Sequence, residues 1–363
     1  MLKFLELRPE AFGLDISDLS LKIIKLKKKG NLFDLASFGE AQIKPGIIRA
    51  GEIKDEKKLA EIIKEAVKSV KGEKIKTKYV VASLPEEKAF LQVIQMPRMS
   101  EEDLKSAVIY EAENYIPLPI ESVYLDSRTI SPVYNHLDHL DVLIAALPKK
   151  TVDPYLSALK LAGLKPLVLE IESLAIARAL TKDELTSSPV LLIDIGATRT
   201  SFIIFSGHSL RFTSSIPVSS GSLTEIISKA LKTNLPEAEN LKIEYGLQLK
   251  KKKGKEIFEA LVPALTDLVQ QIKRCLIYYQ THAAHEHLPP DGKGVSKILL
   301  CGGGTNLKGL TDFLSLQLRI PTELGNPWIN ILAKDQREVS QLPFEESLSY
   351  TTALGLALRG IRK

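Results

Sequence analysis

The sequence contains few of the residues and patterns that mark several large classes of protein. Its two cysteines, Cys275 and Cys301, lie on different predicted elements and form neither a disulfide framework nor metal-ligand spacing. No apolar run approaches the roughly 18 to 20 residues needed to span a bilayer, and residues 1–8 lack the apolar core of a signal peptide. We therefore expect a cytoplasmic protein without disulfides.

The basic residues are not organised for nucleic-acid binding. The net charge of +5 is modest for 363 residues, and the lysine runs at 27–29 and 250–253 contain no interleaved aromatic residues. We expect these runs to be solvated tips of hairpins or loops, with contact to an anionic membrane surface as the alternative. The chain is long enough for two domains, each with its own core.

What the sequence does contain is a strand–turn–strand pattern in its second half. Residues 191–195 form an apolar run rich in Leu and Ile, and residues 201–205 form a second apolar run. Two such runs around a turn residue, Gly196, predict a β-hairpin. Asp194 would then lie at the end of the first strand, beside the turn.

A weaker copy of this hairpin occurs near the N-terminus, at residues 13–26. When the two copies are aligned, Asp15 matches Asp194 and Ile16 matches Ile195. Two similar hairpins about half a chain apart indicate two domains of common architecture that face one cleft.

The chemistry that such a pair favours is phosphate binding. Backbone N–H groups exposed in a glycine-bearing turn bind anions, and one carboxylate from each turn can hold Mg²⁺ through its waters. This combination indicates a nucleotide di- or triphosphate as the ligand. One hairpin alone would be a weak indication, because an Asp before a turn usually serves the turn itself.

A third element supports the same cleft. The predicted strand 297–300 leads into Gly302, Gly303 and Gly304, which would allow a flat ring to lie against the backbone. Thr305 or Asn306 is expected to cap the helix that follows. A tight strand-to-helix turn is the alternative, but such a turn needs one glycine rather than three.

The remaining patterns divide the chain into two α/β domains. We expect a first domain at 1–188 with a small α+β subdomain inserted at 86–165. A second domain should occupy 189–342 and contain a helical subdomain at 221–296. Residues 343–363 should return to the first domain as an apolar helix.

The order of these motifs resembles the nucleotide site of the actin-like ATPase superfamily, which includes actin, sugar kinases, heat-shock chaperones and the cell-division protein FtsA. Four segments are more specifically similar to the PilM family, and the similarity covers nearly the whole chain. These segments are residues 96–100, 110–117, 325–328 and 353–360. The resemblance implies an actin-like ATPase (ribonuclease H-like) fold, with two domains around a nucleotide cleft and an inserted subdomain placed as in FtsA.

The resemblance also implies a set of nucleotide-site residues for ATP or ADP with Mg²⁺. They are Asp15, Ser17, Lys22, Asp194, Gly196, Ala197, Thr198, Glu239, Lys242, Gly302, Gly303, Gly304 and Asn306. The two aspartates would face Mg²⁺ through water, the 196–198 turn would face the phosphates, and Lys22 would lie on the β-phosphate side. Within the helical subdomain, Glu239 would bind the ribose hydroxyls and Lys242 would lie against the adenine. The alternative for these last two residues is a surface i,i+3 ion pair.

The first turn departs from the family pattern, which has glycine at Ser17 and a small neutral residue at Asp18. A carboxylate about 5 Å from a phosphate would be repelled by roughly 3 kcal/mol at an effective dielectric of about 20. Mg²⁺ or Lys22 could offset this repulsion, or Asp18 could turn to solvent. No residue is placed by the sequence as a water-activating base. Glu170 and Glu172 are candidates by position only, and helix-start acids have an ordinary explanation in the helix dipole.

The family resemblance implies an ATP-binding assembly protein of the type IV pilus machinery. Such a protein binds the N-terminal cytoplasmic tail of the membrane protein PilN and thereby meets the inner-membrane platform. It is cytoplasmic and peripheral to the inner membrane through its protein partners. The related type II secretion protein L continues into a transmembrane segment, whereas this chain is expected to stop before one. A filament-forming protein like FtsA and a small-molecule kinase of the same fold are the alternatives. The sequence leaves open whether the chain forms a homo-oligomer.

The insert is the expected docking surface for the tail. Its predicted helix, residues 101–115, carries an apolar stripe, part of which must pack on the strands of the insert itself. The stripe consists of Leu104, Ala107, Val108, Ala112 and Tyr115. We therefore expect the peptide groove in the space between the insert and the first domain.

Overall fold

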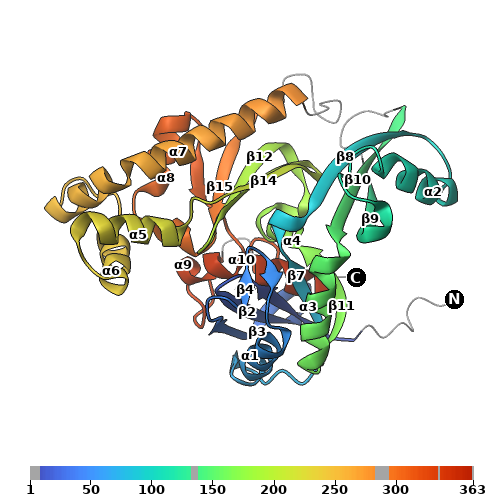
Figure 1. Cartoon of the computed structure of the whole chain (residues 1–363), viewed down its shortest axis with the longest axis horizontal. Coiled ribbons are helices and arrows are strands. Elements are labelled where there is room, and N and C mark those ends of the chain that lie inside the picture. The colour runs from blue at the N-terminus through green and yellow to red at the C-terminus, as the bar shows by residue number, and fades with distance from the viewer. Residues whose placement is uncertain (1–8, 132–137, 283–293, 334–335, 362–363) are drawn as a thin grey trace.

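The computed structural model describes residues 9–131, 138–282, 294–333 and 336–361, and its helices surround three main sheets (Figure 1). The first sheet has six strands. In spatial order they are β11 (Lys165–Ile171), β7 (Tyr79–Leu84), β1 (Ala11–Ile16), β2 (Ser20–Lys29), β3 (Leu32–Gln42) and β6 (Lys71–Gly72). A small ribbon of β4 (Ile48–Arg49) and β5 (Glu52–Ile53) follows β3 in the chain.

The second sheet repeats the strand order of the first when the first is read from β3 to β11. Its strands are β14 (Ser209–Ile216), β13 (Thr200–Gly207), β12 (Thr186–Ile195), β15 (Lys297–Cys301) and β16 (Thr322–Leu324). In each sheet an antiparallel three-strand meander begins at the central strand, and two parallel strands continue on its other side. The repeat expected from the two hairpins is therefore confirmed, with β1 equivalent to β12.

The insert is a separate three-stranded antiparallel sheet covered on one face by a helix. Its strands are β8 (Phe90–Pro97), β10 (His139–Pro148) and β9 (Val123–Ile130), and its helix is α2 (Glu101–Ala112). The next helix, α3 (Lys149–Leu161), was expected within the insert but packs in the first domain with α1 (Glu56–Lys68). Because Tyr155 and Leu159 are fully buried there, the insert proper is shorter than 86–165.

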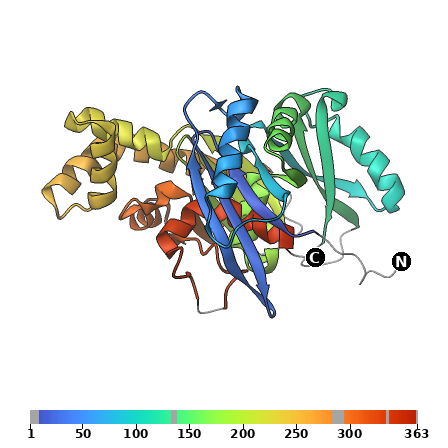
Figure 2. The same cartoon turned by 90° about the horizontal axis from the view of Figure 1, so that it is seen from below.

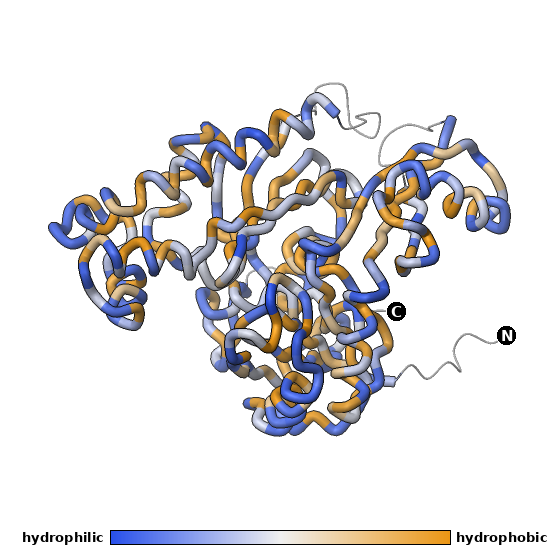
Figure 3. Tube along the Cα trace, in the orientation of Figure 1, coloured by the Kyte–Doolittle hydropathy of each residue, from blue (hydrophilic) through white to orange (hydrophobic). Residues whose placement is uncertain are grey.

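Helix α10 (Thr351–Ile361) returns to the first domain as expected. It lies between β1 and helix α4 (Glu172–Leu180), and its residues 351–358 are all buried. The approach is close because Gly355 has no side chain: a Cβ there would lie 1.9 Å from the Ala175 carbonyl oxygen. In Figure 3 the apolar segments follow the sheets and the elements packed on them, and polar segments predominate at the periphery.

The second domain carries a helical region on one side of its sheet. Its helices are α5 (Ser220–Leu231), α6 (Leu235–Tyr245) and α7 (Lys252–His282), and α8 (Leu310–Leu318) packs on the same core. The short helix α9 (Phe344–Ser347) precedes α10. Helix α7 continues through Pro263 without a break. Figure 2 shows this helical region and the insert on opposite sides of the first sheet.

One helix cap differs from the expectation. Residues Gly303–Asn306 form a short 3₁₀ turn, η5, and α8 starts later with Gly309 as its N-cap. Thr305 instead donates to the carbonyl of Gly302 at 2.7 Å, and Asn306 donates to the carbonyl of Glu345 at 3.0 Å. Among the described helices, none is both long and apolar enough to cross a membrane.

Candidate functional site

A cleft of about 760 Å³ opens where the two hairpin turns meet. It is lined by every residue expected at the nucleotide site except Lys242. These residues are Asp15, Ser17, Lys22, Asp194, Gly196, Ala197, Thr198, Glu239, Gly302, Gly303, Gly304 and Asn306. The strand order of the two sheets explains the convergence, since the carboxyl ends of β1 and β12 face each other across the cleft.

Two aspartates form the centre of the cleft. Asp15 and Asp194 are the penultimate residues of β1 and β12, so each is fixed by a sheet rather than by a loop. Burial raises the pKa of Asp194 to about 6, and the charge of Asp15 adds to this rise while Lys22 opposes it. Burial likewise raises the pKa of Asp15. Its Oδ1 is buried and has no hydrogen-bond partner among the described residues. This pair is prepared to receive positive charge.

A third acid, Glu172, joins this centre. It is the first residue of α4, directly after β11, and one of its carboxylate oxygens accepts the backbone N–H of Glu86 at 3.2 Å. Burial, followed by the charges of Asp15 and Glu87, raises the pKa of Glu172 well above its usual range. Its neighbour on the strand, Glu170, lies outside the cleft. Of the two acids named by position, only Glu172 faces the cleft.

The first hairpin turn lines the cleft and is held by hydrogen bonds from its own side chains. The N–H and hydroxyl of Ser17 both donate to the Ser20 carbonyl, each at 2.9 Å. The carboxylate of Asp18 accepts the N–H groups of Ala50 and Gly51 at 3.0 and 2.9 Å. Asp18 therefore holds the β4–β5 loop, so its charge has partners other than solvent and need not face a phosphate.

The second turn is open to the cleft at Gly196, Ala197 and Thr198. It is braced from behind, because the Gly196 N–H donates to the Arg199 carbonyl and the first two N–H groups of α5 donate to the carbonyls of Gly196 and Ala197. The Arg199 side chain crosses the cleft to form an ion pair with Glu87 of the 3₁₀ turn η2 (Glu86–Lys88) in the first domain.

The helical side of the cleft contains Glu239 and Lys242, both on α6. Glu239 lines the cleft, whereas Lys242 is buried behind it and is not among the lining residues. The Lys242 ammonium donates to Glu239 at 2.7 Å, to both oxygens of Ser220 at 2.8 and 3.0 Å, and to the Thr224 hydroxyl at 2.7 Å. Burial lowers its pKa despite the opposing effect of Glu239. Lys242 thus joins α6 to α5 and orients Glu239, and its contact with a base stays a prediction.

The glycine-rich segment reaches the aspartate centre. Gly302 has φ +88°, and a Cβ there would lie 2.2 Å from the Asp194 Oδ1 and 2.6 Å from the Ile195 carbonyl oxygen. Gly303 meets only the Ser349 Cβ at 3.7 Å. The glycines therefore serve two purposes: Gly302 allows β15 to pass β12 closely, and Gly303 leaves space on the cleft side.

A second cavity, of about 380 Å³, lies between the insert and the two domains. Alternation along β10 separates the faces of the insert, since Val142, Ile144 and Ala146 pack in the core beneath α2, whereas residues 143, 145 and 147 line this cavity. Helix α2 is therefore on the opposite face. Most of its stripe is core of the insert, as expected, but Tyr115 is 42% exposed. We call this second cavity the insert groove.

The insert groove is largely apolar with charged groups at one side. Its other walls come from α3, α4 and the edge strand β11, and from residues that follow β13. Arg178 donates two hydrogen bonds of 2.6 Å to Glu170, and both side chains are almost fully buried. This paired arrangement supplies hydrogen-bonding groups without an uncompensated charge.

Sequence reasoning missed Glu87 and Arg199 at the cleft. Arg199 follows the predicted turn directly, and this adjacency was the available signal. Glu87 had no local signal, because its position depends on the parallel pairing of β7 with β1.

No cluster of three or more potential metal ligands is found in the described part of the chain. A cation in the cleft would therefore share its coordination with water and a ligand.

Comparison with known proteins agrees with this geometry. The family model described as type IV pilus assembly protein PilM matches residues 13–361. A solved PilM–PilN type IV pilus biogenesis complex has a TM-score of 0.80 and 30% identity, covering 98% of this chain and all of that chain. MreB5 of Spiroplasma citri bound to AMPPNP has a TM-score of 0.53 at 15% identity, over 96% of this chain and 95% of that one.

The cell-division protein FtsA of Pseudomonas aeruginosa is 27% identical over 216 residues, which are 53% of this chain and 47% of FtsA. The chain thus matches about half the length of this relative. The two sheets of common strand order, the FtsA-like insert and the match over residues 13–361 lead to one conclusion. This chain belongs to the PilM family of type IV pilus assembly proteins and has the actin-like ATPase fold.

Proposed function

We propose that this chain is a nucleotide-binding assembly protein of the type IV pilus machinery that binds the N-terminal cytoplasmic tail of PilN and links it to the inner-membrane platform. The observation that carries the proposal is the position of α4 between two cavities. Its first residue, Glu172, belongs to the acidic centre of the cleft, and Leu174, Ala177 and Arg178 line the insert groove. One helix therefore borders a phosphate-type site and a peptide-type site.

The cleft fits an adenine nucleotide with Mg²⁺. Asp15 and Asp194 supply carboxylate oxygens, which Mg²⁺ prefers, and the unpartnered Oδ1 of Asp15 has no other cation within hydrogen-bond distance among the described residues. In the turn at 196–198, the backbone amides of Ala197 and Thr198 would bind the phosphates, since the Gly196 N–H already donates to the Arg199 carbonyl. MreB5, which shares the fold, has been solved with ADP and with AMPPNP. Bound Mg²⁺ would neutralise charge at the phosphates, and ATP hydrolysis is not part of the proposal.

The insert groove fits an extended apolar segment. Strand β9 is the edge of the insert sheet, and β11 is the edge of the first sheet, so each has one side that pairs with no strand in the described part of the chain. Unpaired edges bind extended peptides through main-chain hydrogen bonds, and neighbouring pockets select their side chains. The solved relative at 30% identity is itself a complex with PilN. A short tail that orders on binding would join a chain of this kind to the membrane.

The test is a binding assay with a labelled peptide that copies roughly the first dozen residues of the cognate PilN. We expect the full chain to bind it with or without Mg-ATP, and to bind a scrambled peptide at least about tenfold more weakly. Equal binding of both peptides, or crosslinks confined to residues 189–342, would contradict the groove assignment.

Point substitution is sharper than deletion of the insert. Removing residues 86–165 would also remove α3, whose buried residues belong to the core of the first domain. Ala145→Arg places a large charged side chain in the insert groove and should abolish peptide binding. Leu167→Arg is the matched control, because Leu167 is 44% exposed on β11 and is not a groove residue. Both variants should show the thermal shift that millimolar Mg-ATP gives the wild type.

A further inference from the structure

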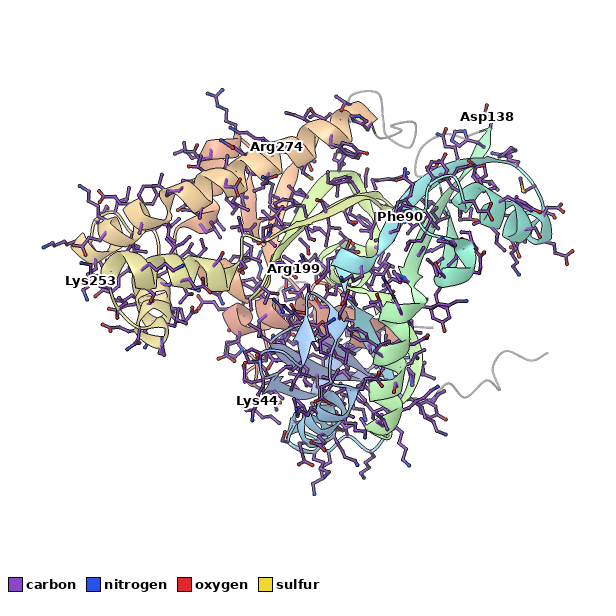
Figure 4. All side chains as sticks on the ribbon, in the orientation of Figure 1. Lys44, Phe90, Asp138, Arg199, Lys253 and Arg274 are labelled. Atoms are coloured by element: carbon purple, nitrogen blue, oxygen red, sulfur yellow. The ribbon has the colours of Figure 1, made fainter. Side chains whose placement is uncertain are left out.

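An ion pair joins the two domains at the phosphate end of the cleft. Nη1 of Arg199, at the end of the second hairpin turn, contacts Oε1 of Glu87 in η2. The side chains are 28% and 12% exposed, so the pair is partly withdrawn from water. Figure 4 places Arg199 at the centre of the molecule, between Asp138 at one end of the insert and Lys253 at the far end of the helical region.

Arg199 has hydrogen-bonding capacity left in this arrangement. Its Nε is buried and has no hydrogen-bond partner among the described residues. A guanidinium carries five N–H donors in a planar fork that matches phosphate as well as carboxylate. The turn that ends in Arg199 lines the cleft at the proposed phosphate site. A ligand phosphate bound to that turn would therefore lie next to an arginine with an unused donor.

Glu87 lies at the root of the insert. The segment η2 connects β7 of the first sheet to β8, and in Figure 4 Phe90 labels the start of that strand. The Glu86 N–H donates to Glu172, and the Lys88 ammonium contacts Glu52 at 2.9 Å. One three-residue segment thus contacts the acidic centre, strand β5 and the second-domain turn. A change in the partner of Arg199 would act on this segment first.

We propose that Arg199 exchanges Glu87 for the terminal phosphate of a bound nucleoside triphosphate, and that this exchange releases η2 and the first residues of the insert. The inference rests on the proposed nucleotide function. A terminal phosphate carries more negative charge than a carboxylate and accepts bidentate hydrogen bonds from arginine, so it competes for the guanidinium. A nucleoside diphosphate has no third phosphate for Arg199 to bind. The residue therefore distinguishes triphosphate from diphosphate and transmits the difference to the insert groove.

Calorimetry of the full chain with Mg-ATP and Mg-ADP tests the exchange. Glu87→Gln removes the competing charge and should tighten Mg-ATP binding about five- to tenfold, with less than about twofold effect on Mg-ADP. Arg199→Gln should remove most of the preference for Mg-ATP. In the Arg199→Gln background, Glu87→Gln should have no further effect, because the two residues act as one unit.

Lys88→Gln is the matched control. It removes an ion pair from the same short segment, but the partner Glu52 belongs to the first domain and the pair does not cross the cleft. Its affinities for both nucleotides should stay within about twofold of the wild type. An ATP-selective effect of Lys88→Gln equal to that of Glu87→Gln would overturn the role of Arg199.

Hydrogen exchange of residues 86–97 supplies the second measurement. Mg-ATP, but not Mg-ADP, should speed exchange there in the wild type, and Arg199→Gln should speed it without nucleotide. Equal effects of the variants on both nucleotides, or exchange that does not respond to Mg-ATP, would identify a static contact and overturn the inference. Wild-type protein that binds neither nucleotide would instead overturn the proposed function itself. If Arg199→Gln fails to fold, the ATP-selective gain of Glu87→Gln alone decides.

Discussion

The two domains share a strand order but use equivalent positions differently. After β15 the second domain has three glycines, whereas after the equivalent strand β7 the first domain has Pro85, Glu86 and Glu87, followed by the insert. The hairpin turns differ as well. Both close with a backbone hydrogen bond and both line the cleft, but in the first turn the Ser17 hydroxyl and the Asp18 carboxylate add side-chain hydrogen bonds. The first domain thus supplies charge and an added subdomain, and the second supplies backbone that a ligand can approach. The shared strand order places the two domains around one cleft, and the four loops that differ determine what each domain contributes to it.

The largest expected effect comes from a substitution that disrupts the close approach of β15 to β12 in the second domain. Gly302→Ala would place a Cβ against Asp194 and Ile195 at a residue with φ +88°. We expect the free energy of unfolding to fall by about 3 kcal/mol or more, because the strain and the overlap add. Chemical denaturation measures it. Gly303→Ala is the control, since its Cβ meets only Ser349 at 3.7 Å, and it should change the stability by less than about 1 kcal/mol. Similar losses in both variants would contradict this distinction.

Local sequence patterns predicted many of the residues that line the cleft. They missed those whose position depends on contacts between distant parts of the chain. Asp15 and Asp194 were found because each lies in a strand–turn–strand pattern that is continuous in sequence. Glu87 belongs to the cleft only through parallel strand pairing, which links residues far apart in the chain. Lys242 was recognised by its motif, but a motif does not tell whether its ammonium group already has hydrogen-bond partners, here three oxygens of α5 and one of α6.

The second effect concerns Asp194, the second-domain member of the pair of aspartates at equivalent positions of the two domains. Asp194→Ala should abolish the increase in melting temperature given by millimolar Mg-ATP, because the metal loses a carboxylate neighbour. The empty variant should melt no lower than the wild type, since a carboxylate with a raised pKa is removed from a crowd of like charges. A full nucleotide shift in Asp194→Ala would show that the cation depends on Asp15 alone.

A smaller effect is the pH dependence of the empty cleft. The pKa of Asp194 is about 6 in the folded protein against an ordinary value of 3.8, so between these values the folded state holds a proton that the unfolded state has released. This stability is present at low pH and is lost as the pH rises through about 6. The free energy of unfolding should fall by about 1 kcal/mol, which is less than the full pKa shift would give, because the cleft admits solvent. Unfolding at pH 5 and 7 measures it, and Asp194→Asn should remove this part of the change.

The smallest effect sharpens the contrast between the two turns. Asp18 holds the N–H groups of Ala50 and Gly51, and Ala50 has a left-handed backbone with φ +49°. Asp18→Ser should therefore lower the free energy of unfolding by about 1 kcal/mol, with Asp18→Asn losing less because it keeps one acceptor. Mg-ATP affinity should stay unchanged in both. The sequence had suggested the reverse, a repulsion between this carboxylate and a phosphate. Calorimetry that finds tighter Mg-ATP binding in Asp18→Ser would restore that repulsion and show that the carboxylate leaves the β4–β5 loop when the cleft fills.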